Sequence, residues 1–429
     1  MKVLVIGGGG REHALVWALG RSTRVSEVVC APGNAGIAAL ARCVALDVTD
    51  VDATIALAME EMPGLVVIGP EVPLSLGVVD ALQARGLRVF GPTRAAAQLE
   101  TSKAFAKELM RRNEIATPAY AVCRTPSEVA EALRAFGVPV VVKADGLAAG
   151  KGVVICQTHE AAAAAAAQMF SGDLLGAEVS EVLVEEFLEG EELSFFALCD
   201  GATAVPIAAA QDHKRVGEGD TGPNTGGMGA YSTDALMGPE MSAWLTGHVA
   251  QRVVDGMREQ GMEFRGVLFC GMMMVLNEDG AVRPMVLEFN TRFGDPETEA
   301  LMLRLETDVL DLLEASVDGT AGSLDVRLRP GASACVVAAS GGYPGGYASG
   351  KVISGLGDVS GDVVVFHCGT VERDGAVVTS GGRVLGVTAA SELGLEDALA
   401  RVYGAMKGIG FEGMQYRRDI GWRALREAR

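Results

Sequence analysis

The sequence predicts a multidomain protein of mixed α/β and α+β class, with a doubly wound parallel sheet at its N-terminal end. Three observations support this prediction. The 429 residues are enough for two or three domains with proper cores. The first hundred or so alternate short apolar strands with helical patterns, as in βαβ units. From about residue 101 the pattern changes to strand–loop–strand segments around glycine-rich loops.

In the N-terminal part, strands are expected at residues 2–6, 27–30, 65–68 and 87–90, and a helix at 11–19. Parallel sheets of this kind bind ligands beyond the carboxyl ends of their strands. Those ends read "GGGGREH", "APGNAG", "GPE" and "GPT" here. Four strand ends rich in glycine and proline therefore predict a crevice at one edge of the sheet.

The middle of the chain favours antiparallel pairing. "SKAFAKELMRR" is helical, whereas "PVVVKADGLAAGKGVVIC" and "EVLVEEFLEGEELSFFAL" each read as a hairpin-like strand, loop and strand. The segment "QDHKRVGEGDTGPNTGGMGAYS" is expected to be one long loop, and loops of that length are often functional. A helix is expected at 297–305. Further strands, "ASACVVAAS" and "DVVVFHCG", and the helix "EDALARVYGAMKGI" follow.

Composition excludes several classes of protein. A net charge of −19 argues against a nucleic-acid-coating surface, although small anionic substrates need only a few local donors. The eight cysteines include no Cys-x-x-Cys pair, which favours free thiols in a reducing compartment. No apolar run reaches the length of a membrane span, and the N-terminal run is too short for a signal peptide. The expected location is cytoplasmic.

The first glycine loop, in "VLVIGGGGREHAL", lies between a strand and a helix, where backbone N–H groups bind phosphate. Glu12 replaces the third glycine of a dinucleotide fingerprint, and no acidic residue follows the second strand at Cys30 and Ala31. These details favour a small phosphorylated substrate over a dinucleotide. A tight turn that only closes the sheet explains this motif alone nearly as well.

Two further segments suit a nucleotide. "KADGLAAGKG" resembles a flexible hairpin tip with Lys143 and Lys151 at its sides, able to close over phosphates. "VLVEEFLEGEELSF" is an extended acidic linker whose backbone can read an adenine edge while a glutamate accepts from ribose hydroxyls. The plainer alternatives are a solvated glycine turn and a solvated charged face.

Anion and metal chemistry is suggested further along the chain. The basic, glycine-rich loop from residue 211 suits an anion clamp, with a disordered lid as the alternative. Glu288 and Asn290 are two apart on an expected strand and so share a face. Their oxygens suit Mg²⁺ or Mn²⁺. Each motif is weak alone, but their combined order predicts a nucleotide-dependent enzyme.

Seven segments together resemble the phosphoribosylamine–glycine ligase (glycinamide ribonucleotide synthetase) family of the ATP-grasp superfamily, over nearly the whole chain. They are "GGREHAL", "APGNAG", "GPEVPL", "KADGLAAGKGV", "QDHKRVGEGDTGPNTGGMGAYS", "LEFNTRFGDPE" and "DIGWRA". The resemblance implies an N-terminal substrate-binding domain at 1–101, an ATP-grasp domain at 102–322 with a mobile lid at about 120–190, and a small C-terminal α/β domain at 323–429. It also implies that ATP, glycine and 5-phospho-β-D-ribosylamine give glycinamide ribonucleotide, ADP and phosphate.

The resemblance assigns site residues by position. It implies that ATP contacts Lys103, Lys143, Gly150, Lys151, Gly152, Glu185, Glu186, Phe187, Leu188 and Glu192. Glu288 and Asn290 would bind Mg²⁺ or Mn²⁺. Phosphoribosylamine would meet Gly9, Gly10, Arg11, Gly33, Asn34 and Glu71. The glycine acceptor site would hold Asp212, His213, Lys214, Arg215, Asn224, Thr225, Gly226, Gly227, Arg292 and Asp295. Arg292, Lys151 and Asp295 are the expected catalytic residues.

Two positions depart from the family. Gly8 stands where the family often has Asn or Ser. The strand at 271–275 carries no carboxylate, although many ATP-grasp enzymes bind a second metal ion there.

Three alternative functions are weighed. The nearest is another ATP-grasp enzyme of the purine pathway, a carboxylase or a formate-using transferase. A nicotinamide-dependent dehydrogenase conflicts with the broken fingerprint, and a nucleotide-binding regulatory protein conflicts with the retained lysines and Glu288. The expected partners are small molecules alone, without nucleic acid or membrane, and the expected assembly is a monomer or weak homodimer.

Overall fold

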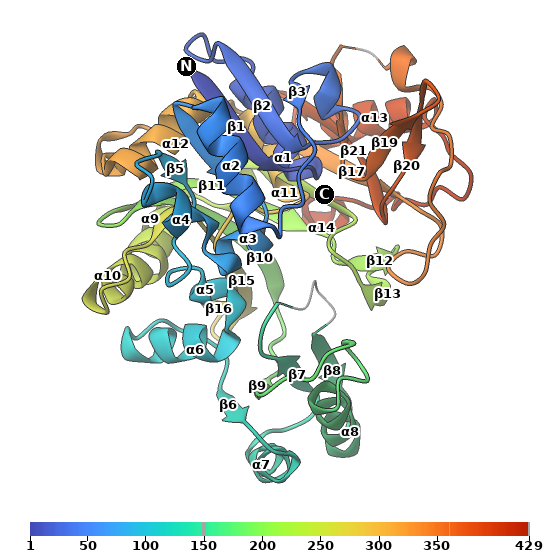
Figure 1. The fold of residues 1–429 in the computed structure, drawn as a ribbon. Helices are drawn as coiled ribbons and strands as arrows, with labels where there is room; N and C mark the ends of the chain where they lie inside the picture. The colour runs from blue at the N-terminus through green and yellow to red at the C-terminus, as the bar shows by residue number, and fades with distance from the viewer. Residues whose placement is uncertain (148–151, 360, 428–429) are drawn as a thin grey trace.

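The N-terminal part of the computed structural model, which describes residues 1–147, 152–359 and 361–427, is a five-stranded parallel sheet (Figure 1). Its strand order is β3-β2-β1-β4-β5. The strands are β1 (Lys2–Gly7), β2 (Glu27–Pro32), β3 (Arg42–Cys43), β4 (Leu65–Ile68) and β5 (Val89–Phe90), and the helices are α1 (Gly10–Leu19), α2 (Val51–Glu61), α3 (Glu71–Leu76) and α4 (Val78–Gln83). The last strand is two residues shorter than predicted.

Helices cover both faces of this sheet. In β1, Val3 and Val5 pack with Leu15 of α1, whereas Leu4 and Ile6 pack with residues of α2 and α4 such as Ala58. Successive side chains of a strand point to opposite faces, so the continuous apolar run of β1 is buried on both. The predicted doubly wound sheet is confirmed.

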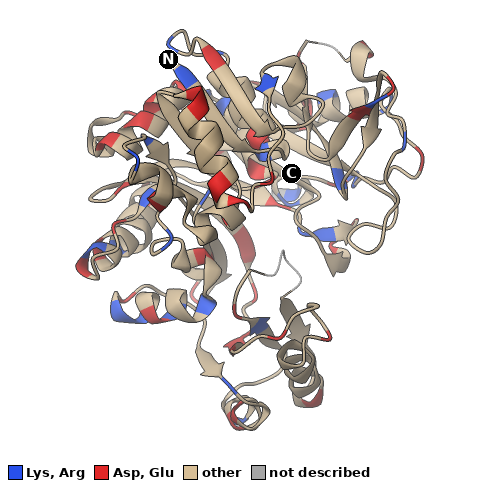
Figure 2. Ribbon diagram, in the orientation of Figure 1, with Lys and Arg blue, Asp and Glu red and all other residues tan. Residues whose placement is uncertain are grey.

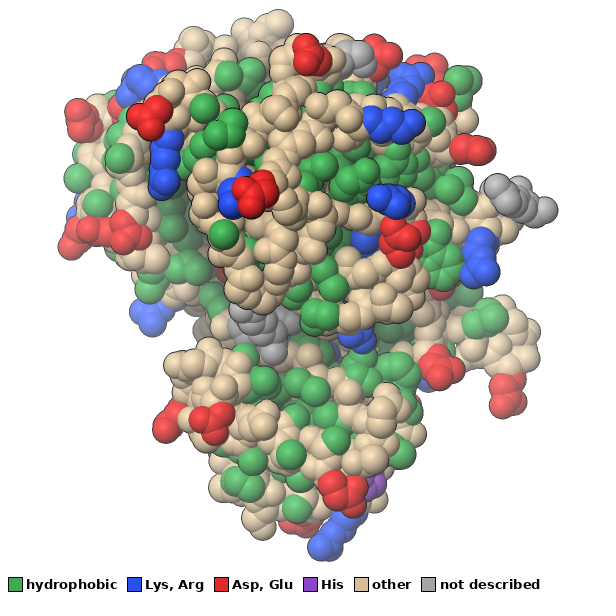
Figure 3. Space-filling model, turned by 90° about the vertical axis from the view of Figure 1, so that its right-hand side faces the viewer, with side chains coloured by type: hydrophobic (Ala, Val, Ile, Leu, Met, Phe, Trp, Pro, Cys, Tyr) green, Lys and Arg blue, Asp and Glu red, His purple; other side chains and the backbone are tan. Residues whose placement is uncertain are grey.

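A separate four-stranded antiparallel sheet forms a lobe below the body of the molecule (Figure 1). Its order is β6-β9-β7-β8, and α7 and α8 pack on it. In the space-filling view the lobe is narrower than the body and tapers away from it (Figure 3). The elements are β6 (Tyr120–Cys123), α7 (Pro126–Ala132), β7 (Val140–Ala144), β8 (Val153–Cys156), α8 (His159–Phe170) and β9 (Val182–Glu186).

The largest sheet has eight strands in the order β16-β15-β10-β11-β14-β17-β21-β18, all antiparallel. Its strands are β10 (Glu191–Asp200), β11 (Ala204–Asp212), β14 (Gly229–Thr233), β15 (Arg265–Leu276), β16 (Val282–Asn290), β17 (Ala332–Ala339), β18 (Val363–His367) and β21 (Arg383–Ser391). The remaining longer elements are α5 (Gln98–Thr101), α6 (Lys103–Arg112), α9 (Pro239–Leu245), α10 (Gln251–Glu259), α11 (Glu297–Arg304), α12 (Val309–Asp318), β19 (Thr370–Arg373), β20 (Ala376–Thr379), α13 (Leu395–Met406) and α14 (Trp422–Glu427).

Two predictions about the middle of the chain are wrong. The strands β9 and β10 do not form a hairpin, because β9 belongs to the lobe and β10 to the large sheet. The linker between them therefore crosses from one sheet to the other. The expected loop 211–232 contains the two-stranded ribbon β12 (Arg215–Gly217) and β13 (Thr221–Asn224), followed by β14. The short, glycine-rich strands of this ribbon lack the apolar alternation that identifies a strand.

Lys, Arg, Asp and Glu residues are distributed over all parts of the molecule (Figure 2). The described residues include no helix long and apolar enough to cross a membrane.

The large sheet is continuous across the domain boundary predicted at residue 322. Strand β14 pairs with β11 on one side and with β17 on the other.

Truncation after residue 322 should leave a chain that does not fold as a monomer. The cut removes β17, all of whose residues are buried, and exposes an edge of β14 along the pairing from Gly229 to Thr233. Exposed apolar sheet edges associate with other chains. Size-exclusion chromatography of the fragment should show aggregates, and a monomer with the near-ultraviolet circular dichroism of a packed core would contradict the shared-core interpretation.

Candidate active site

A cavity of about 800 Å³ lies between the lobe and the large sheet. The N-terminal sheet contributes Arg11 and Glu71 to its lining, and the C-terminal part contributes Tyr343 and Arg383. Cavities of several hundred cubic ångströms bury a ligand of nucleotide size. Residues separated by more than 300 positions therefore meet at one site.

The floor of the cavity is the end of β16, which carries Glu288 and Asn290. Glu288 lies opposite Gly271 of β15, next to an irregularity in the strand pairing. A side chain at position 271 would place its Cβ 3.2 Å from Cγ of Glu288. A side chain at position 271 would therefore require a small shift of the Glu288 side chain.

The charge of Glu288 is stabilised by surrounding cations. Burial raises the pKa of the carboxyl, but Lys214, Lys143, Lys103 and Arg292 attract its charged form, and the net pKa is lowered. An ionised carboxylate therefore sits among four cationic side chains on the cavity floor. Such a cluster attracts both a metal cation, through Glu288, and the anionic groups of a ligand, through the lysines.

Glu288 and Asn290 supply two oxygen donors of the kind that Mg²⁺ prefers. The described residues contain no group of three or more His, Cys, Asp or Glu side chains placed to hold a metal ion. Magnesium in phosphate-transfer sites uses one or two carboxylates and takes its other ligands from phosphates and water. The donor set therefore fits a metal that arrives with a nucleotide rather than one enclosed by protein.

Three buried side chains form a triad beside this floor. Glu185 Oε2 lies 2.9 Å from Lys143 Nζ and 3.2 Å from Lys107 Nζ, and Lys143 also donates to the Leu287 carbonyl at 3.3 Å. Burial lowers the pKa of Lys107 to about 8, although Glu185 opposes the shift. The other carboxylate oxygen of Glu185 has no hydrogen-bond partner and is free to accept from a ligand.

Lys103 links α6 to the hairpin of the lobe. Its Nζ donates to the Gly146 carbonyl at 3.0 Å, and Asp145 accepts from the Ala104 amide and the Ser102 hydroxyl. Burial lowers the pKa of Lys103, and Glu288 offsets part of that effect. Gly152 is buried behind the cavity lining, and its carbonyl accepts from Ala144. The predicted site residues Gly150 and Lys151 lie outside the described residues.

The linker that crosses between the sheets also lines the cavity. Glu185, Glu186, Phe187 and Leu188 are all part of the lining, as is Glu192, the second residue of β10. Glu192 Oε2 lies 2.7 Å from Lys214 Nζ. An apolar and polar strip at the junction of two sheets suits a flat heteroaromatic group.

The wall opposite this linker comes from the segment around β12 and β13. Asp212, Lys214, Arg215, Asn224, Thr225 and Gly226 line the cavity, whereas His213 and Gly227 are not brought to it. His213 is fully buried, and its Nε2 accepts from the Gly421 amide at 3.1 Å. Burial, followed by Arg417 and Arg423, lowers its pKa to about 4. His213 therefore attaches this wall to the C-terminal segment.

Arg292 ties the cavity floor to the N-terminal part of the chain. Its guanidinium lies 2.9 Å from Glu100 and 3.3 Å from Glu71, and it donates to Asn290 Oδ1 at 3.3 Å. Arg11 donates to the Phe293 carbonyl at 3.2 Å. The arginine predicted to be catalytic is thus held in place by two carboxylates, of which Glu100 was not predicted.

The glycine loops of the N-terminal sheet lie behind the lining. Asn34 donates to the Gly8 carbonyl at 2.9 Å and to the His367 carbonyl at 2.6 Å, so both loops and the C-terminal part are fastened together. A Cβ at Gly8 would lie 2.5 Å from the Gly33 carbonyl oxygen. That contact explains the glycine at position 8. Gly9, Gly10, Gly33 and Asn34 are not in the cavity lining.

Asp295 is held by a residue that the sequence did not indicate. Arg383 Nη1 lies 3.2 Å from Asp295 Oδ1 and donates to its carbonyl at 2.7 Å. Tyr343 accepts from the Gly226 amide at 2.9 Å. Both partners lie in the C-terminal part, far along the chain, and no local motif marks them. Lys107 was also missed, although its helical spacing of four residues from Lys103 places the two on one face of α6.

An antiparallel lobe facing a larger sheet across a lysine-rich cleft is the architecture of ATP-grasp enzymes. Family models for phosphoribosylglycinamide synthetase match the chain in three parts: the N domain at 1–100, the ATP-grasp (A) domain at 101–298 and the C domain at 333–423. The phosphoribosylamine–glycine ligase of Xanthomonas campestris is 49% identical over 100% of this chain and 99% of its own, and that of Brucella melitensis is 49% identical over 99% and 98%. The chain belongs to this family of ligases.

Solved structures agree. The phosphoribosylamine–glycine ligase of Thermotoga maritima superposes with a TM-score of 0.86 at 33% identity and covers 98% of this chain and 100% of its own. The biotin carboxylase domain of the 2-oxoglutarate carboxylase of Hydrogenobacter thermophilus has a TM-score of 0.73 at 17% identity, covering 97% and 91%, and shares the fold alone. The family, fold class and enzyme class predicted from sequence are confirmed, and the dehydrogenase alternative is excluded.

The burial of His213 should make stability sensitive to acid. Its pKa is about 4 in the folded chain and 6.5 for an ordinary histidine, so only the unfolded chain takes up this proton between those values. The resulting loss in the free energy of unfolding is absent above pH 6.5. It grows as the pH falls, at roughly 1.4 kcal/mol per pH unit, to about 3 kcal/mol at pH 4. In urea unfolding, His213→Gln should reduce the loss of stability over this range.

The matched control is His159→Gln, whose side chain is exposed at the start of α8. It should leave the pH dependence as in the parent chain. An unchanged slope for His213→Gln would show that this histidine does not stay neutral in the folded protein.

Proposed function

We propose that the chain joins glycine to 5-phospho-β-D-ribosylamine with ATP, giving glycinamide ribonucleotide, ADP and phosphate in de novo purine biosynthesis. The observation that carries the proposal is the junction on β16, where Glu288 and its four cationic neighbours meet the wall that contains Asp212 and Lys214. A nucleotide's terminal phosphate and a small carboxylate can meet at that junction. The names of the relatives support the same substrates.

ATP is proposed to lie along the lobe side of the cavity. The linker 185–188 would hold adenine and Glu192 the ribose, while Lys103, Lys143 and the hairpin residues Gly150, Lys151 and Gly152 would hold the phosphates. Glu288 and Asn290 would hold Mg²⁺ or Mn²⁺, which supplies charge neutralisation of the phosphates. The biotin carboxylase domain with the same fold was solved with MgADP, which supports a nucleotide with Mg²⁺ as the ligand.

The two other substrates are proposed to bind on the far side of β16. Glycine would lie against Asp212, Lys214, Arg215 and the 224–227 segment, with Arg292 and Asp295 at the reacting end and His213 behind. Phosphoribosylamine would approach from Arg11 and Glu71, with Gly9, Gly10, Gly33 and Asn34 shaping the loops there. Arg292 would stabilise the transferring phosphoryl group with Lys151, and Asp295 would accept the proton released by the amine.

The proposed chemistry has two steps. A glycine carboxylate oxygen attacks the terminal phosphorus of ATP and ADP leaves, giving glycyl phosphate. The amine nitrogen of phosphoribosylamine then attacks the acyl carbon, phosphate leaves and the nitrogen loses a proton. A closed cavity protects the acyl phosphate from water. The limit at 101, the limit at 322 as a segment boundary within one shared sheet, the lid at 120–190, the cytoplasmic location and a monomer or weak homodimer remain parts of the proposal.

The rival within the superfamily is a purine-pathway carboxylase or formate-using transferase. Phosphate release should be measured with ATP, phosphoribosylamine and glycine, bicarbonate or formate in turn. The proposal requires that, of the three small acids, only glycine supports phosphate release, and that the rate depends on the concentrations of both glycine and phosphoribosylamine. Release with bicarbonate or formate, and none with glycine, would replace it with the rival function.

Glu288→Gln should reduce turnover by about a hundredfold or more, because the variant keeps the shape of the side chain and removes the charge that the cationic cluster and the metal require. The measurement is phosphate release across a magnesium titration, with thermal unfolding as a check on folding. Glu278→Gln, on the exposed turn between β15 and β16, is the control. Unchanged activity and magnesium dependence would refute the metal assignment.

Glycine labelled with heavy oxygen in its carboxylate should transfer one labelled oxygen to inorganic phosphate. The cationic cluster surrounds the floor beside Glu288 and is suited to the terminal phosphate, where negative charge develops during transfer. Mass spectrometry of the phosphate and nucleotide products measures the label. Label in AMP, together with pyrophosphate, would establish an adenylate intermediate instead.

A further inference from the structure

The β12–β13 ribbon forms the cavity wall but belongs to neither large sheet. Arg215, Asp220 and Asn224 of this ribbon line the cavity, yet its two strands pair only with each other as a separate two-stranded sheet. Isolated two-stranded ribbons are marginally stable in water. Something outside the ribbon has to hold it in position for its side chains to face the cavity.

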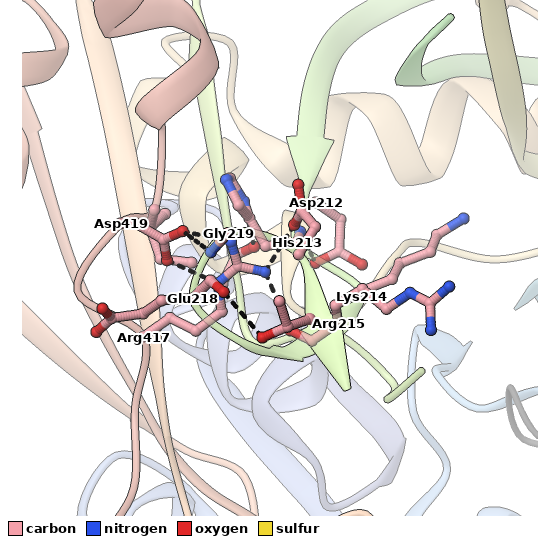
Figure 4. A network of polar contacts seen from close by, with 12 residues as sticks. Asp212, His213, Lys214, Arg215, Glu218, Gly219, Arg417 and Asp419 are labelled. Carbon is pink, nitrogen blue, oxygen red and sulfur yellow. Dashed lines mark hydrogen bonds and ion pairs between the residues drawn. The ribbon is translucent and has the colours of Figure 1, made fainter. Parts of the chain in front are cut away.

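The C-terminal segment 417–423 provides that support (Figure 4). Arg417, only 1% exposed, donates from Nε and Nη2 to both carboxylate oxygens of Asp419 at 2.8 Å. Its remaining nitrogen, Nη1, donates to Asp220 at 2.8 Å and to the Arg215 carbonyl at 3.1 Å. One guanidinium thus joins the C-terminal segment to the first residue of β12 and to the turn that precedes β13.

The turn of the ribbon is fastened at further points. Asp419 Oδ2 accepts from the Gly219 amide at 2.8 Å, and Glu218 accepts from the Arg418 amide at 3.3 Å. Arg423 also donates to Asp220. The backbone of Asp220 has a φ of 57°, in the left-handed region that side chains rarely adopt. Two guanidinium groups therefore hold the residue on which the turn depends.

The support continues into the strand that reaches the cavity floor. Thr225 donates from its amide and its hydroxyl to the Lys214 carbonyl at 2.7 and 2.8 Å, which closes the base of the ribbon. His213 at that base accepts from Gly421. Both ends of the ribbon are thus attached to the same short C-terminal segment. The desolvation of Arg417 is offset by its bonds to Asp419, Asp220 and the Arg215 carbonyl, so removing the guanidinium would leave these groups without it.

We propose that Arg417 is a positioning residue for the glycine site: through Asp220, Asp419 and the Arg215 carbonyl it holds the β12–β13 ribbon so that Lys214, Arg215 and Asn224 face the cavity. The proposal rests on the proposed function in naming glycine as the ligand of this wall. The nucleotide residues Lys103, Lys143 and Glu185 lie on α6, β7 and β9 and do not depend on this network. Loss of Arg417 therefore weakens the use of glycine more than that of ATP, to which this wall contributes only through Lys214 and its pair with Glu192.

The test compares Arg417→Met and Arg417→Lys with Arg401→Met. Arg401, in the same part of the chain, pairs with Asp397 on α13 at 2.7 Å and serves as the matched control. The expected result for Arg417→Met is a glycine KM raised by about tenfold or more, with an ATP KM changed by less than about threefold. Arg417→Lys keeps the charge but loses the planar guanidinium that bonds to both oxygens of Asp419. Its glycine KM should therefore lie between those of Arg417→Met and the parent chain.

A second readout does not depend on the substrates. Amide hydrogen exchange of peptides covering 213–226 should be faster in Arg417→Met than in Arg401→Met, with exchange in α6 and β7 unchanged. If Arg417→Met does not fold, Asp419→Asn, which leaves Arg417 bonded to Asp220, should show the same pattern at smaller size.

The outcomes separate the two proposals. Equal effects on the glycine and ATP KM values, or faster exchange in 213–226 with an unchanged glycine KM, would overturn the positioning role of Arg417. A parent chain that releases no phosphate with glycine would instead refute the proposed function, while the exchange measurement would still report whether Arg417 orders the ribbon.

Discussion

The buried triad of Lys107, Glu185 and Lys143 is the interaction on which the site depends. Glu185 lies on β9 of the lobe, Lys143 on β7 and Lys107 on α6. Lys143 also bonds to β16 through the Leu287 carbonyl, next to Glu288. Lys143 therefore joins the lobe to the large sheet, and the carboxylate of Glu185 holds two cations where a nucleotide's phosphates are proposed to bind. Removing charges from water is costly, so this arrangement persists only because each charge has a partner.

The same principle extends across the cavity. Lys214 is paired with Glu192, and Arg292 with Glu71 and Glu100, so the cations around Glu288 are already fixed before any ligand arrives. Groups that are fixed in advance need little reorganisation when charge develops during a reaction. At the wall formed by the β12–β13 ribbon, the residue that holds the structure in place is Arg417, in the C-terminal segment 417–423. The C-terminal part therefore contributes to the site mainly by holding other residues in place.

Much of the fold could be predicted because the information is local. The buried run Leu65–Ile68 and the helix Glu297–Arg304 show their structure in the spacing of apolar residues. Strand partners are not local, which is why β9 and β10 were misassigned as a hairpin. The supporting residues were missed for the same reason: Glu100 bonds to Thr291 across 191 positions and Arg417 to Asp220 across 197. The resemblance assigned His213 to the acceptor site together with Asp212 and Lys214, which do line the cavity, whereas its own ring turns to Gly421.

The most direct test of the triad is the affinity of Glu185→Gln for MgADP, measured by titration calorimetry. Without the charge of Glu185, Lys107 and Lys143 lose their common partner and burial favours the neutral form of Lys107, so binding should weaken by about tenfold or more. Glu181→Gln, which lies just before β9 and pairs with Arg124, is the control and should bind as the parent chain does. If Glu185→Gln binds MgADP as tightly or more tightly, Glu185 competes with the phosphates for the lysines, and the account of a preset cationic site is contradicted.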